Sequence, residues 1–167
     1  LLTPRPEVFQ QPGWPKSRDW RQTLQPHYET AKRMLGAGTV PQVYPADELI
    51  RKAAEVAGCG DSFRRQTVGV FFGKSGETVS DPYFNGDGPS RTGCTHCGGC
   101  LVGCKVGAKN TLDKNYLYLA EKNGVRILPE TQVELIHPEQ DGYVIETKGL
   151  GFFSKKRRTK YRCSKLI

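Results

Sequence analysis

Several features are missing from the 167-residue chain. No apolar run approaches the roughly 18 residues that a membrane-spanning helix needs, and no charged start followed by an apolar stretch indicates a signal peptide. There is no internal repeat, and Gly and Pro together make up only 30 residues, short of a low-complexity chain. These absences exclude a transmembrane protein, a coiled coil and a collagen-like fibre, and they favour a cytoplasmic location.

The first and last residues of the chain are not those typical of a complete protein. It opens on Leu1-Leu2-Thr3-Pro4 without Met and ends on the apolar run Lys165-Leu166-Ile167. We therefore expect a piece of a longer protein. Hydrophobic residues make up 37% of the chain, which is enough for a lean core.

Charge is concentrated near the end of the chain. The formal net charge is +8, and the last thirteen residues carry seven basic side chains and no acid: Lys155, Lys156, Arg157, Arg158, Lys160, Arg162 and Lys165. Without these seven, 18 basic residues face 17 acidic ones, so the rest of the chain is nearly neutral. The run fits either an anion-binding patch or a solvated hairpin tip, and the thin aromatic content favours the tip and argues against nucleic acid binding.

The hydrophobic periodicity predicts a mixed α and β chain. Helices are expected over 28–35, 47–57 and 111–122, and strands over 67–72, 126–128, 132–137, 143–147 and 161–167. The last three strands should form an antiparallel meander. The fold class predicted is therefore α+β.

Four of the six cysteines form a compact run. Cys94, Cys97, Cys100 and Cys104 have the spacing C-x2-C-x2-C-x3-C, typical of an iron–sulfur site. The interspersed glycines allow backbone conformations through which thiolates could converge on one metal. Zinc and unligated structural thiols remain alternatives, because structural zinc usually takes two separated pairs of ligands. The cysteine run by itself predicts a small iron–sulfur or zinc-binding module that acts in electron transfer or interaction, without catalytic activity.

The remaining cysteines and histidines give weaker signals. Cys59 and Cys163 are predicted to be ordinary buried residues. His27 and His137 are predicted to be structural or surface residues, whereas His96, inside the cysteine run, is a candidate ligand or tuning group.

The segment 94–136 resembles the glucose–methanol–choline (GMC) oxidoreductases, especially their cholesterol-oxidase-like bacterial branch. The residues that carry the resemblance are CTHCGGCLVGCKVGAKNTLDKNYLYLAEKNGVRILPETQVELI, with weaker similarity before and after them. The resemblance implies a two-domain enzyme that uses FAD to oxidise an alcohol, sterol-like among the candidates. Residues 1–92 would then be part of the substrate domain, and 93–167 part of an incomplete Rossmann-type FAD domain.

The resemblance also implies roles for individual residues. Val133 matches the valine whose backbone meets the adenine of FAD, and Gly107, Ala108 and Asn110 match a loop that passes near the flavin. Some relatives with an electron-acceptor protein bind an iron–sulfur cluster just before this loop, which implies the same role for the four cysteines. The expected partners are the remainder of the polypeptide, an alcohol substrate and an electron acceptor.

Two family motifs are absent from the chain. It has no G-x-G-x-x-G after a strand to hold the FAD pyrophosphate, because Gly58-Cys59-Gly60 follows a helix. None of the three histidines lies in the context of the catalytic histidine. We therefore predict no catalytic residue here, and we expect the chain alone to be inactive and to bind FAD weakly.

Overall fold

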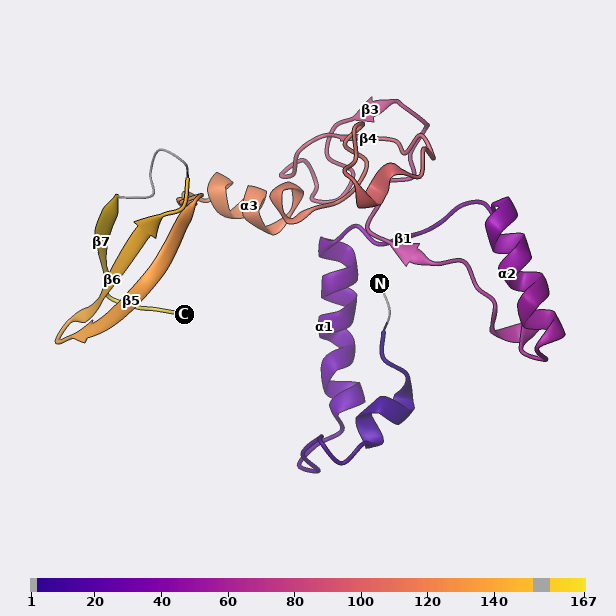
Figure 1. Cartoon of the computed structure of the whole chain (residues 1–167), viewed down its shortest axis with the longest axis horizontal. Helices are drawn as coiled ribbons and strands as arrows, with labels where there is room; N and C mark the ends of the chain where they lie inside the picture. Colours follow the sequence, from indigo (N-terminus) through magenta and orange to yellow (C-terminus); the bar gives the residue numbers. More distant parts are fainter. Residues whose placement is uncertain (1–2, 152–156) are drawn as a thin grey trace. The chain divides into compact units, whose positions relative to one another are not determined.

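A computed structural model describes residues 3–151 and 157–167 of the chain. They fall into two compact units, Leu1–Gly124 and Val125–Ile167. The first unit contains three α-helices and two small antiparallel pairs of strands, and the second is a three-stranded sheet, so the predicted α+β class is confirmed (Figure 1). The units divide after Gly124, whereas the assignment of 1–92 and 93–167 to substrate and FAD domains stays a prediction.

The first helix, α1 (Trp20–Met34), is longer than the predicted 28–35. Asp19 caps its start by accepting the N–H of Gln22 at 3.0 Å, a strong initiation signal. Pro26 lies inside the helix without ending it. The C-terminal end is as predicted, since Gly36 follows with a φ of +54°.

The other two helices confirm the prediction to different degrees. α2 (Pro45–Val56) begins with Pro at its first turn, and Asp47 accepts the N–H of Tyr44 at 2.9 Å. α3 (Tyr116–Lys122) is shorter than the predicted 111–122, because residues 112–114 form a separate 3₁₀ turn. Asn115 separates the two with a φ of −135° and a ψ of −100°, a conformation that hydrophobic periodicity does not reveal.

Two short antiparallel pairs lie in the first unit. β1 (Gly38–Thr39) pairs with β2 (Thr67–Val68), and β3 (Thr78–Val79) pairs with β4 (Arg91–Thr92). The predicted strand 67–72 is thus reduced to two residues. Its remainder is held by other segments, since Phe71 donates to Ala108 O at 2.8 Å and accepts from Cys94 N at 3.0 Å.

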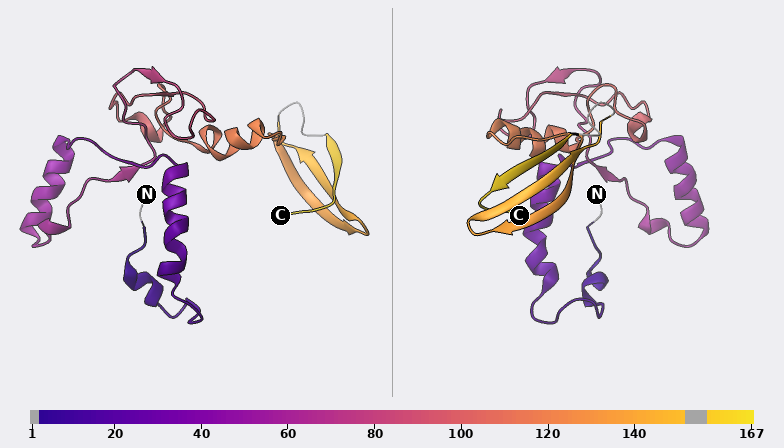
Figure 2. Two further views of the ribbon diagram at one scale, coloured as in Figure 1. Left: turned by 180° about the vertical axis from the view of Figure 1, so that it is seen from behind. Right: turned by 60° about the vertical axis from the view of Figure 1, so that its left-hand side comes forward.

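The second unit is the predicted meander. β5 (Thr131–Glu139), β6 (Gly142–Gly149) and β7 (Arg158–Cys163) are antiparallel in that order, and Figure 2 shows β6 between its two neighbours from two further sides. The predicted strand at 126–128 is wrong, and β7 ends at Cys163, four residues before the predicted end. Of the basic tip, Lys155 and Lys156 lie outside the described residues.

Charged pairs join the strands of the meander. Lys160 contacts Glu146 at 2.7 Å, and Arg158 and Lys148 contact Glu134 at 3.6 and 3.9 Å. The basic residues of β7 that are visible therefore have acidic neighbours within their own sheet. This arrangement favours the solvated-hairpin interpretation of the basic run over an anion-binding patch.

The buried apolar core is small. Val70 and Ala108 are buried in the first unit and Val144 in the second, while Val56, Leu101 and Val102 are more than 90% exposed. Cys59 is exposed, so its prediction as a buried residue is wrong, and Cys163 is half-buried. Within the described ranges, no helix combines the length and apolar character needed to cross a bilayer.

Candidate functional site

The cysteine run lies in an irregular loop of the first unit. Gly98, with a φ of +72°, leads into a 3₁₀ turn at 99–101, and Gly103 follows with a φ of +118°. Cys97 and Cys100 are exposed, whereas Cys94 and Cys104 are half-buried. The glycines thus adopt the left-handed conformations that the sequence predicted, and two of the four thiols reach solvent.

The four thiols are not gathered around one point. Among residues 3–151 and 157–167, no three side chains of the His, Cys, Asp and Glu types are close enough to hold a metal ion. The predicted iron–sulfur site, and the zinc alternative, therefore have no support in this geometry, and we derive no electron transfer through the cysteines. All six cysteines are free thiols.

Cys104 has the most unusual environment of the four. Burial alone would raise the pKa of its thiol, but the backbone N–H groups of Lys109, Ala108, Val106 and Gly107 outweigh burial and lower it. Successive N–H groups aimed at one atom form an anion-binding concavity. The N–H groups of residues 106–109 therefore favour the thiolate form of Cys104.

His96 is held by aromatic neighbours. Its Nδ1 shares a hydrogen bond with the Tyr44 hydroxyl, and its ring stacks on Phe72 at 5.9 Å between centroids. Its backbone N–H points to Cys94 Sγ at 3.4 Å, with the residue in a left-handed conformation at a φ of +57°. This environment gives the ring a structural role that joins the cysteine loop to the start of α2.

The predicted flavin-proximal loop is firmly anchored. Asn110 donates its N–H to Gly69 O at 2.8 Å, and its side chain donates to Gly36 O at 3.4 Å. Lys114 Nζ donates to Gly107 O at 2.8 Å. Hydrogen bonds to segments on both sides of the loop therefore anchor it at Gly107 and Asn110.

The four predicted FAD contacts differ in how accessible they are. Ala108 is fully buried and Asn110 is 9% exposed, so their side chains face the protein. Gly107 is half-buried, and Val133 is 51% exposed on β5. Gly107 and Val133 are thus accessible to a ligand, each in its own unit, whereas the side chains of Ala108 and Asn110 are not. Their contact with the cofactor stays a prediction.

Sequence reasoning did not find Arg91, the most buried charged residue described. It is 1% exposed and donates Nε–H to Asn110 Oδ1 at 2.6 Å, and its Nη atoms donate to the carbonyls of Pro89, Ser90 and Lys114. Burial lowers the pKa of Arg91, partly offset by Tyr83, Asp81 and Asp113, and a guanidinium stays charged at neutral pH. It lies in a Gly- and Pro-rich stretch without periodicity, so the sequence carries no signal of its burial.

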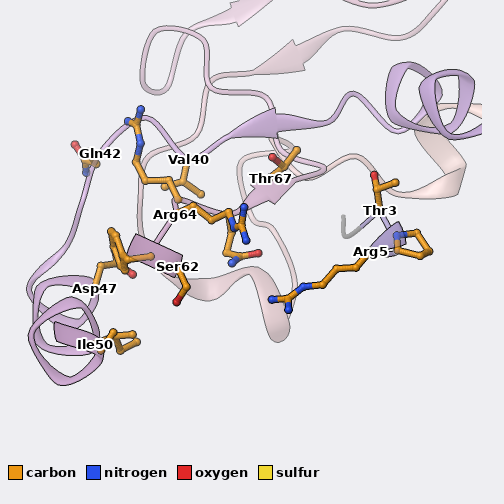
Figure 3. Close-up of a pocket in the computed structure, with 14 residues that line it drawn as sticks. Thr3, Arg5, Val40, Gln42, Asp47, Ile50, Ser62, Arg64 and Thr67 are labelled. Atoms are coloured by element: carbon orange, nitrogen blue, oxygen red, sulfur yellow. The ribbon is translucent and has the colours of Figure 1, made fainter. Parts of the chain in front are cut away.

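A cavity of about 840 Å³ lies elsewhere in the first unit, within the predicted substrate-domain segment. Figure 3 shows Arg5 extending into it from the N-terminal segment, while Asp47 and Ile50 come from α2. Its wall also includes Arg64 and Arg65. Three arginines do not match the mostly apolar wall of a pocket for a sterol ring, so we do not identify this cavity with the substrate site.

Comparison with known proteins gives one consistent result. The chain is 44% identical over 170 residues to a cholesterol oxidase of Acinetobacter baumannii, a match that covers 95% of the chain and 31% of the relative. It is 41% identical over 173 residues to the cholesterol oxidase of Mycobacterium tuberculosis H37Rv, covering 100% of the chain and 30% of the relative. No family model and no solved structure matches.

These matches confirm the resemblance predicted from the sequence. The chain spans about 30% of the length of the curated relatives that it matches. It is therefore similar to a segment of these cholesterol oxidases. The Rossmann-type part of the prediction is not confirmed, since the described strands form only small antiparallel sheets.

Proposed function

We propose that this chain is part of an FAD-dependent oxidoreductase that oxidises the alcohol group of a sterol-like substrate. The observation that carries the proposal is the 41–44% identity to cholesterol oxidases over 95–100% of the chain. The anchored loop 107–110 and the exposed Val133 are compatible with it. The alternative function, that of a small metal-binding module, has no such support, because the cysteines do not converge on one point.

In this proposal the chain supports the cofactor and does not itself react with substrate. Bound FAD would supply the hydride acceptor for alcohol oxidation. Gly107 and the β5 strand around Val133 would contact the cofactor, while Asn110 and Ala108 hold the loop in place. The base that takes the hydroxyl proton lies outside the residues that we can assign, since no histidine of this chain matches that role.

Flavin content of the complete protein is the first test. We expect about one FAD per polypeptide after purification and flavin bleaching when a 3-hydroxysterol is added under anaerobic conditions. Oxygen consumption and reduction of a soluble dye are then measured in parallel, so that the electron acceptor is determined directly. A complete protein without flavin, or with flavin that no sterol reduces, would contradict the proposal.

A pair of glycine variants tests the predicted cofactor loop. Gly107 and Gly124 have similar left-handed conformations, with φ values of +79° and +85°, so Ala costs each about 1 kcal/mol of backbone strain. Gly107→Ala should lower flavin occupancy, because the new methyl group would lie 3.3 Å from Lys114 Nζ and crowd the loop at its accessible residue. Gly124→Ala, at a position with open space, should destabilise similarly but keep its flavin. Equal flavin content in the two variants would argue against Gly107 as a contact.

A further inference from the structure

Two cations hold the loop 107–110, and both bind neutral acceptors. Arg91 donates to Asn110 Oδ1 at 2.6 Å, and Lys114 donates to Gly107 O at 2.8 Å. Arg91 is almost completely buried and Lys114 is half-buried. Among the residues that the structure describes, no carboxylate makes an ion pair with either of them.

The carboxylates nearby do not neutralise this charge by contact. Asp81 and Asp113 act on Arg91 only through space. Both oxygens of Asp81 are already used by backbone N–H groups of its own loop. A buried charge without an ionic partner is costly, and carbonyl oxygens compensate only part of that cost. Arg91 and Lys114 therefore place two positive charges beside the loop that no carboxylate contacts among the described residues.

We propose that Arg91 and Lys114 are positioning residues that hold the loop 107–110 in place and make it electropositive, so that the reduced form of the bound flavin is favoured. This inference rests on the proposed function, because it takes the loop to lie beside FAD. Flavin gains negative charge on reduction, and a positive potential beside it stabilises the reduced form and raises the reduction potential. Arg91 acts through Asn110, and Lys114 acts through the carbonyl of Gly107.

Two variants of the complete flavoprotein test the inference without removing the buried guanidinium. Asn110→Asp keeps the shape of the side chain and the acceptor for Arg91 Nε and gives the guanidinium a negative partner, at the loss of the 3.4 Å hydrogen bond to Gly36 O. Lys114→Met removes the second cation at a half-buried position. Both variants should shift the flavin midpoint potential to more negative values, measured by spectroscopic titration against a reference dye.

Lys74→Met is the matched control, because Lys74 is 82% exposed and pairs with Glu77 at the surface. It should leave the flavin potential unchanged. Thermal unfolding of each variant is measured alongside. The flavin potentials of variant and wild type are then compared at a temperature at which both proteins are folded. A wild-type potential in both flavin-containing variants would overturn the inference. Absence of flavin from the wild-type protein would instead overturn the proposed function, and the two failures are thereby distinct.

Discussion

Asp81 organises a loop of the first unit through one carboxylate. Its two oxygens accept backbone N–H groups at 2.8–3.0 Å from Tyr83, Phe84, Gly86 and Gly88. Burial would raise the pKa of Asp81, but the N–H groups of these four residues outweigh burial and lower it below the ordinary 3.8. One side chain thus satisfies four donors that a Gly-rich loop would otherwise leave to water.

This contact predicts an acid-sensitive contribution to stability. Since the folded pKa is depressed, the contribution is present above the unfolded pKa and is lost as the pH falls from about 4 through the folded value. Asp81→Asn should cost about 1–3 kcal/mol at pH 7, because the amide NH₂ cannot accept from the remaining N–H groups. Urea unfolding of the complete protein at several pH values between 3 and 7 measures both effects.

The exposed Asp87 provides the control for that prediction. Its carboxylate pairs with Lys122 at 2.8 Å and is 72% exposed, so Asp87→Asn should cost no more than about 1 kcal/mol. If the Asp81 variant loses as little stability as this control, or keeps the wild-type loss of stability below pH 4, the carboxylate does not hold the loop.

Among the secondary-structure elements, the hairpin between β5 and β6 depends on the absence of one side chain. Gly142 has a φ of +147°, and a Cβ at this position would lie 2.1 Å from Cys163 O and 2.9 Å from Ser164 Cα. Both are backbone atoms at the end of β7, and backbone atoms cannot rotate away as a side chain can. The turn therefore tolerates only glycine at this position.

Gly142→Ala should destabilise the meander by about 1–3 kcal/mol, as overpacking and a strained backbone both act. Hydrogen exchange of the β6 amides in the complete protein should accelerate, since β6 pairs with strands on both sides. Gly13→Ala is the control, because nothing lies within 4 Å of that position. Unchanged exchange in β6 of the Gly142 variant would show that the turn can adjust.

The regular elements of the two units could be predicted better than the contacts between loops. The hydrophobic periodicity predicted β5, β6 and β7, and apolar residues at helical spacing from Leu49 to Ala57 predicted most of α2. The start of α1 was missed because Pro26 masks the periodicity upstream. The junction at Asn115 was missed for a related reason, since its backbone conformation depends on the buried surroundings and not on a local pattern.

The sequence pattern also failed to predict how the residues of the candidate site are arranged in space. Residue type and spacing predicted that the cysteines share one metal, but convergence depends on the path of the loop between them. The burial of Arg91 could not be predicted, because it depends on the backbone carbonyls of three other residues. Relationship to cholesterol oxidases, by contrast, could be predicted from residues 94–136, because that signal comes from similarity and not from folding physics.

The state of the thiols in the complete protein gives the last prediction. Cys59, Cys97 and Cys100 are exposed, whereas Cys94, Cys104 and Cys163 are half-buried. A thiol reagent such as DTNB should therefore label three of these six cysteines quickly in the native protein and all six after unfolding. Cys59→Ser and Cys97→Ser should each remove one fast thiol, because both side chains reach solvent independently.

The same titration separates free thiols from a bound metal. An iron–sulfur cluster would protect Cys97 and Cys100 but leave Cys59, outside the run, fully reactive. Cys59 is thus an internal standard for reagent access in each preparation. Protection of Cys97 and Cys100 that ends when iron is removed by acid or chelator would contradict the geometry described here and restore the cluster as an electron exit. Fast labelling of all three thiols in a flavin-containing protein would mean that electrons leave FAD without passing through the cysteine loop.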